Sequence, residues 1–357
     1  MFYIHKTACI SPQQTYPDAE INVLTGSADN KLRATEPSYE GIPAGTLRRM
    51  SKSVKLGVGA ALPLLRDAAA PDGILIGTGN GGMEDSVRFL KQIIEYKEEA
   101  LAPGTFVQST PNSIASQIAL LSNNKGYNIT HVHRGLAFEN AAIDVGMLLA
   151  EHPLKSFLLG GVDEISSYNF NLEYLEGWYK KEALSNKDLY ESDTPGSIAG
   201  EGAVLFLVNN KKADALAELK AVATLHSRDE NVVRRRLQDF IGSHLPAGEK
   251  PDLFLTGENG DSRLLKFYTS CETLLEERVA IARFKHMSGE YPTAQAFAVW
   301  LACHLTRGYS LPFHMLKKSS VTREFKNILI YNTHQGVQHS FTLVSKVAQP
   351  TFILPGT

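Results

Sequence analysis

The segment PNSIASQIALLSNNKGYNITHVHRG, residues 111–135, decides the fold. Its first half is apolar at helical spacing, which predicts a helix over 112–122. A glycine then precedes a strand expected over 127–133. The strand ends in a tight turn at Gly135, and a second helix is expected over 136–150. A helix, a strand and a helix in succession indicate α/β layering.

The same alternation extends through the rest of the chain. Polar residues 184–197 predict a surface loop that leads into a glycine turn and a buried strand. No low-complexity segment or long Pro/Gly linker divides the chain, so two similar halves, 1–210 and 211–357, are expected to fold together. Further strands are expected at 73–77, 156–159, 200–207, 252–255, 326–331 and 339–345, and further helices at 83–94, 262–276 and 292–306.

Composition narrows the class of protein. A hydrophobic content of 43% over 357 residues supports a large core, and the net charge is -2. Basic residues are scattered, and the run at 234–236 is interpreted as a solvated helix face, so no nucleic-acid partner is expected. Three distant cysteines predict neither a disulfide framework nor a metal site. With no signal-like N-terminus and no long apolar run, we expect a soluble cytoplasmic protein without a membrane partner.

The segment 111–135 together with Gly160-Gly161-Val162-Asp163-Glu164 resembles the β-ketoacyl-ACP synthases of the thiolase superfamily. The resemblance extends from residue 48 to about 345. It implies a duplicated α/β/α/β/α sandwich of five layers with two mixed five-stranded sheets. It also implies a dimer that pairs through the strand at 127–133. Further segments agree in order and spacing: Arg48-Arg49-Met50-Ser51, Gly77-Thr78-Gly79-Asn80-Gly81-Gly82, Gly200-Glu201-Gly202-Ala203 and Lys285-His286-Met287-Ser288-Gly289.

Three positions depart from the chemistry that the resemblance implies. Where the family carries a nucleophilic Cys and two His, this chain has Gly135, Asn259 and Glu290. Gly135 cannot form an acyl-enzyme, and a Glu290 carboxylate would oppose developing negative charge. Loss of a nucleophile alone costs on the order of a millionfold in turnover. Of the four family residues only Lys285 is retained, and we interpret it as part of a buried ion pair.

Other candidate sites have simpler interpretations. His131 and His133 lie on one face of the strand, but a metal needs further ligands, so interface histidines are favoured and no metal or cofactor is expected. Arg134 is expected at the same interface, and an ion pair between Arg134 and Glu139 could fill the vacated cavity. The glycines of 77–82 are interpreted as a packing turn instead of a phosphate cradle. The loop 333–338 keeps one glycine of the family's acyl gate, so its shape or role is expected to differ.

The resemblance therefore predicts a chain-length-factor-like subunit, inert by itself, that pairs with an active ketosynthase. It implies a bacterial type II pathway with an acyl carrier protein, making a fatty-acid-like, polyketide or aryl polyene product. Two alternatives stay open. One is an enzyme of altered chemistry that uses Glu290, His131, His133 or His286 as acid or base on a carrier-bound thioester. The other is a stand-alone acyl-binding homodimer.

Overall fold

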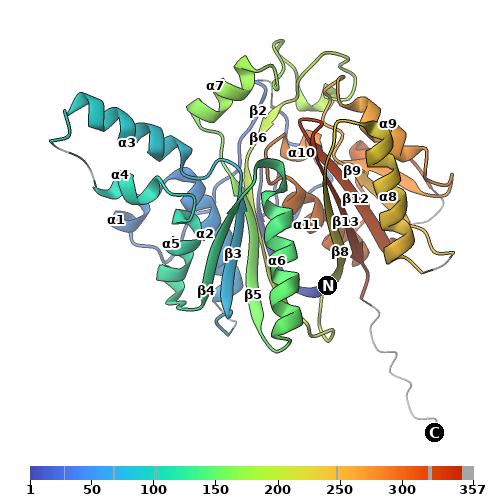
Figure 1. Ribbon diagram of the computed structural model, residues 1–357, viewed down its shortest axis with the longest axis horizontal. Coiled ribbons are helices and arrows are strands. Elements are labelled where there is room, and N and C mark those ends of the chain that lie inside the picture. The colour runs from blue at the N-terminus through green and yellow to red at the C-terminus, as the bar shows by residue number, and fades with distance from the viewer. Residues whose placement is uncertain are drawn as a thin grey trace, which may run out of the picture.

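Eleven strands of the chain form one mixed sheet in the computed structural model, which describes residues 1–27, 29–66, 69–99, 101, 103–246, 248–320 and 324–347 (Figure 1). Strand order across the sheet is β11 (Leu316–Lys318), β10 (Ala280–Arg283), β9 (Leu253–Thr256), β12 (Asn327–His334), β13 (Gln338–Ser345), β8 (Ala217–His226), β1 (Phe2–Ile10), β7 (Gly202–Asn209), β5 (Ser156–Asp163), β3 (Gly73–Thr78) and β4 (Tyr127–Val132).

The sheet count differs from the expected pair of five-stranded sheets. β1 pairs antiparallel with β7 along most of its length, and its first residues also pair with β8, from Phe2 opposite Leu219 to Ile4 opposite Ala217. This short pairing joins a five-stranded and a six-stranded part into one continuous sheet, with β11 as the additional strand. Five strands within residues 1–210 form the first part and later strands form the second, while β2 (Lys31–Leu32) and β6 (Ala199–Gly200) form a separate pair.

Helices complete five layers around the two parts of the sheet. α2 (Lys52–Leu65) and α5 (Ser113–Ser122) cover the outer face of the first part, and α8 (Glu230–His244) and α9 (Leu265–Glu272) cover that of the second. α6 (Ala137–Glu151) and α11 (Gln295–Thr306) lie between the parts and contact strands of both. Because helices cover both of its faces, β3 is buried at every residue.

The smaller elements lie around this sandwich. α3 (Met83–Glu95) and α4 (Pro103–Gln108) project from the first part as an arm (Figure 1). α9 is shorter than the expected helix 262–276 because the Asp261 carboxylate accepts the backbone N–H of Arg263, which holds that turn outside the helix. The remaining elements are α1 (Ala44–Leu47), α7 (Ser167–Leu175), α10 (Lys285–Ser288), β2 (Lys31–Leu32), β6 (Ala199–Gly200) and the short helices η1 (Arg134–Leu136), η2 (Asn186–Asp188) and η3 (Phe313–Met315).

The glycine-rich turn after β3 is a packing turn. A Cβ on Gly77 would lie 2.5 Å from the backbone of Ala137 and Phe138, so only glycine lets β3 approach α6 this closely. Asp163, buried at the end of β5, accepts the N–H groups of Gly79 and Asn80. The donors of this turn are thus satisfied within the protein. No described helix combines the length and the apolar character needed to cross a bilayer.

Candidate functional site

Gly135 lies in η1, directly between the edge strand β4 and helix α6. A Cβ added to it would lie 2.1 Å from Cβ and 2.5 Å from Cγ of His334, which ends β12. The Gly135 N–H donates to Oε1 of Gln338 at 3.0 Å. Residues of the β12–β13 hairpin therefore occupy the space in front of Gly135, and no side chain fits at this position unless His334 moves.

His334 is a neutral imidazole in this position. Burial lowers the pKa of His334 to about 3, and the nearby charges of Lys285 and Arg134 act in the same direction. Its Nδ1 atom is buried and has no hydrogen-bond partner in the described part of the chain. His334, near the start of the loop 333–338, thus covers Gly135.

Asn259, Lys285 and Glu290 form one polar network. Lys285, which is fully buried, donates to Oε1 of Glu290 at 2.8 Å, and the Asn259 side-chain amide donates to Oε2 of Glu290 at 2.7 Å. The predicted buried ion pair of Lys285 is confirmed, with Glu290 as its partner. Both carboxylate oxygens of Glu290 are therefore engaged, which leaves it poorly placed to take up a substrate proton.

Little space remains at this centre. The cavity in front of the network has a volume of about 20 Å³, which is close to the room that one water molecule needs. Gln335 of the β12–β13 hairpin donates to Glu173 of α7 at 2.8 Å, and both residues line the cavity. Burial raises the pKa of Glu173 to about 6. The cavity is lined by Asn80, Glu173, Trp178, Tyr179, Asn259, Asp261, Leu264, Glu290, Tyr291, Pro292, His334 and Gln335.

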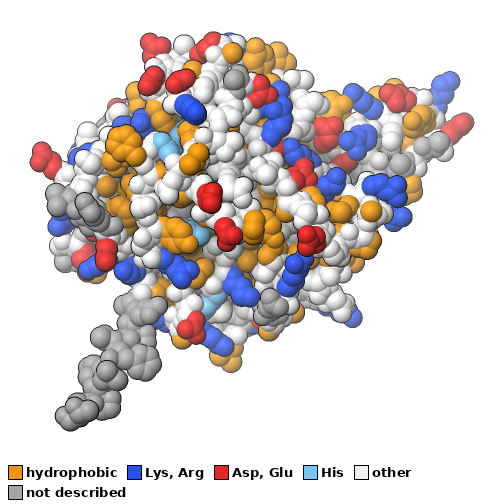
Figure 2. All heavy atoms as spheres, turned by 180° about the vertical axis from the view of Figure 1, so that it is seen from behind, with side chains coloured by type: hydrophobic (Ala, Val, Ile, Leu, Met, Phe, Trp, Pro, Cys, Tyr) orange, Lys and Arg blue, Asp and Glu red, His pale blue; other side chains and the backbone are white. Residues whose placement is uncertain are grey.

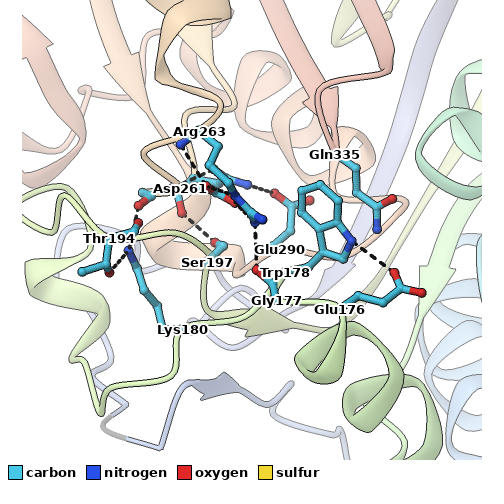
Figure 3. A network of polar contacts seen from close by, with 12 residues as sticks. Glu176, Gly177, Trp178, Lys180, Thr194, Ser197, Asp261, Arg263, Glu290 and Gln335 are labelled. Carbon is cyan, nitrogen blue, oxygen red and sulfur yellow. Dashed lines mark hydrogen bonds and ion pairs between the residues drawn. The ribbon is translucent and has the colours of Figure 1, made fainter. Parts of the chain in front are cut away.

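The rim of this cavity is held by a second set of polar contacts (Figure 3). Arg263 lies over the Trp178 ring at 4.4 Å, and its guanidinium donates to Asp261 at 2.6 Å and to the Gly177 carbonyl at 2.8 Å. Lys180 donates to the carbonyls of Thr194 and Gly260. These polar groups are thus hydrogen-bonded to one another. Through Lys180, they connect the loop 184–197 to the segment that carries Asn259.

The ion pair expected between Arg134 and Glu139 is not formed. Arg134 is exposed, whereas Glu139 points into the interior from the first turn of α6, and taking the guanidinium out of water would cost more than the pair returns. Neither Glu139 carboxylate oxygen has a hydrogen-bond partner among the described residues. Burial raises the pKa of Glu139 to about 7.

His131 and His133 both face α6, as their alternation on the strand predicts. His131 Nε2 lies 2.9 Å from Oδ2 of Asp144, and His133 Nδ1 accepts the Asn140 amide at 2.7 Å. Within the described residues, no three metal-ligating side chains come together. His131 and His133 are therefore engaged by side chains of α6 and not by each other.

The edge of the sheet beside this centre is open. β4 pairs only with β3 among the described strands, and none of its residues is fully buried. Tyr127 is 43% and Val132 53% exposed. The two helices that contact β4 also carry exposed apolar side chains, Leu120 on α5 and Met147 on α6.

The arm formed by α3 and α4 adds a further apolar surface. In Figure 2, where it lies at the right, hydrophobic side chains stand between charged ones. Its exposed apolar residues are Leu90, Ile94, Phe106 and Val107. Exposed apolar patches of this kind mark interaction surfaces in soluble proteins.

Sequence reasoning missed two features of the site. His334 comes from a hairpin about 200 residues beyond Gly135, and nothing in its local sequence shows what it covers. In the sequence, Asp163 stands out only as part of a glycine signature. It receives five hydrogen bonds, from Thr78, Gly79 and Asn80 and from two atoms of Thr293, and so ties β5 to the segment before α11.

Comparison with solved structures identifies the fold, whereas no known family profile and no curated protein sequence matches the chain. A β-ketoacyl synthase from Burkholderia phymatum superposes with a TM-score of 0.77 at 14% identity, over 97% of this chain and 99% of the other. A ketosynthase in complex with its chain length factor from Xenorhabdus doucetiae matches with a TM-score of 0.76 at 14% identity, over 97% and 98%.

A third match is a type II polyketide acyl carrier protein in complex with its ketosynthase, with a TM-score of 0.76 at 12% identity over 97% and 99%. The chain thus has the thiolase-like fold of the ketosynthases and chain length factors, as predicted from the sequence.

Proposed function

We propose that this protein is a chain-length-factor-like subunit, catalytically inert by itself, that pairs with an active β-ketoacyl-ACP synthase. The observation that carries the proposal is the His334 side chain in the space in front of Gly135. Where a condensing enzyme needs a thiolate, this position has neither a nucleophile nor room for one. Glu290, Lys285 and Asn259 fill the rest of the centre with mutual contacts.

The open edge at β4 supports pairing with another chain. A strand that exposes unpaired N–H and C=O groups beside apolar side chains is a template for association unless something covers it. Here β4, Leu120 and Met147 supply such a surface. His131, His133 and Arg134 lie on or next to this strand, and we assign them to the partner interface. A second copy of the chain could use the same surface, so a homodimer is one outcome of the test.

The pathway is part of the same proposal. The neighbours include a ketosynthase with its chain length factor and a ketosynthase with its carrier protein. By analogy we place this subunit in a bacterial type II system that makes a fatty-acid-like, polyketide or aryl polyene product with an acyl carrier protein. We further propose that it works in the cytoplasm, which fits three buried free cysteines.

Altered chemistry on a thioester has less support. Glu290 is engaged by Lys285 and Asn259, and His131 is engaged by Asp144. His286 contacts Tyr190 and does not line the cavity at the centre. None of these candidate acids and bases therefore faces a space that could hold a thioester beside Gly135.

The test is a pull-down of the tagged protein from its native host, followed by a condensation assay with malonyl-loaded carrier protein. We expect recovery of an active ketosynthase whose product length shifts when this subunit is altered. The subunit alone should give no product. Recovery of a lone homodimer that turns over thioesters would contradict the proposal.

A further inference from the structure

A much larger cavity lies on the other side of α10 from the filled centre. It is an open cleft of about 580 Å³, within the range of small-molecule sites, whereas the cavity at the centre measures about 20 Å³. Segments far apart in the sequence meet there. The lining residues are Asn22, Val23, Leu24, Lys187, Tyr190, Glu191, Arg283, His286 and His314.

The floor of the cleft is a chain of hydrogen bonds. His314 Nε2 lies 2.9 Å from the Ile21 carbonyl, which can only accept, so this nitrogen donates. His314 Nδ1 lies 2.8 Å from His286 Nε2, and His286 Nδ1 lies 3.1 Å from the Tyr190 hydroxyl. All four ring nitrogens are therefore engaged within the chain. A polar ligand must be bound by other residues of the lining.

Two cationic side chains of the lining, Arg283 and Lys187, can bind a polar ligand. Arg283 lies over the Tyr190 ring at 3.8 Å and donates to Glu258 at 3.3 Å, but Glu258 is shared with Lys317 at 2.5 Å. Lys187 is exposed and forms no ion pair with any described residue. The lining carries one carboxylate, Glu191, against these two cations. The cleft therefore favours a negatively charged group.

An apolar wall faces these charges. Val23 is 77% exposed, and Leu24 beside it is half-buried against the central core. An exposed valine beside a cleft with a cationic lining gives the site two kinds of surface. A ligand that uses both has a charged end and an apolar end.

We propose that this cleft binds a small organic anion. Its carboxylate or phosphate group lies between Lys187 and Arg283, and its apolar part lies against Val23 and Leu24. The proposal goes beyond the partner role and does not depend on it, because the cleft is separate from both the centre and the β4 edge.

The test follows the imidazole resonances of His286 and His314 by NMR while octanoate, octyl phosphate or inorganic phosphate is added at constant ionic strength. We expect saturable shifts of both histidines with octanoate or octyl phosphate. Whichever of the two binds more tightly identifies the charged group. The variant Lys187→Gln should bind about fivefold more weakly or worse, since one charged contact is lost.

The control is Lys212→Gln, an exposed lysine in the β7–β8 turn, which should leave the affinity unchanged. Thermal unfolding of both variants shows whether the fold is intact. Absence of saturable shifts, or equal binding by wild type and Lys187→Gln, would overturn the proposal. Inorganic phosphate that binds as tightly as octyl phosphate would overturn the role of Val23 and Leu24.

Discussion

The centre around Gly135 and the strand β4 that leads into it differ in how completely other residues of the chain contact them. At the centre, His334 fills the space in front of Gly135, and Glu290 is bonded on both oxygens. Along β4, one side of the strand has no partner among the described strands, and Tyr127 and Val132 are exposed to solvent. The space in front of Gly135 is thus filled by side chains of the chain itself, whereas the adjoining edge strand is not covered by any described strand. The predictions below test that contrast.

The largest loss of unfolding free energy is expected from Lys285→Met. Removal of the ammonium leaves Glu290 as a largely buried carboxylate with only Asn259 as donor, which should cost about 3–5 kcal/mol of unfolding free energy. Urea denaturation measures the loss. The double variant Lys285→Met/Glu290→Gln should recover much of it. A single-variant loss below about 1 kcal/mol would mean that the centre is not closed as described.

The next loss of stability is expected when a cysteine is placed at the centre. Gly135→Cys places a Cβ against His334 and should destabilise the protein by about 3 kcal/mol, since the colliding atoms lie at the base of the imidazole and cannot swing away. Adding His334→Gly should relieve the collision. The matched control is Gly242→Cys on α8, where a Cβ meets nothing within 4 Å. Equal stability of the two cysteine variants would break the steric argument.

Glu139→Gln should change the pH dependence of stability. The folded pKa of about 7 lies above the ordinary value of 4.5, so wild type loses stability as pH rises from 4.5 to 7 and then levels off. The glutamine variant lacks this loss. It should become relatively more stable over that interval, by roughly 3 kcal/mol in all. Denaturation series at several pH values measure the difference, and Glu151→Gln on the exposed side of α6 should show no such trend.

The smallest effect on stability is expected at the edge. Val132→Asp should change the unfolding free energy by no more than about 0.5 kcal/mol, because Val132 is 53% exposed. Recovery of the partner in a pull-down should nevertheless fall sharply, since burial of a carboxylate at the interface takes it out of water at a high cost in free energy. Val232→Asp on α8, a valine that is 39% exposed, is the control. Undiminished recovery with Val132→Asp would place the interface elsewhere.

The sequence allowed the fold to be predicted because its turns and strands are local signals. The resemblance to the β-ketoacyl-ACP synthases draws attention to Gly135 and Lys285 in the sequence, and the ion pair expected for Lys285 is present. The expected ion pair between Arg134 and Glu139, by contrast, is not formed. Arg134 is adjacent to Gly135 in the chain, but His334, brought there by the β12–β13 hairpin, fills the space. Which of two distant side chains fills a cavity depends on tertiary packing, which sequence spacing does not contain.

The double pairing of β1 has a consequence for how the chain folds during synthesis. Phe2–Ile10 leaves the ribosome long before its two neighbours, β7 and β8, which end at Asn209 and His226. β1, with both edges unpaired, must therefore wait until the segment up to Asn209 has been translated. Such long-range pairing slows folding and leaves an apolar strand available for aggregation in the meantime. Molecular chaperones that hold nascent chains should therefore raise the yield of this protein.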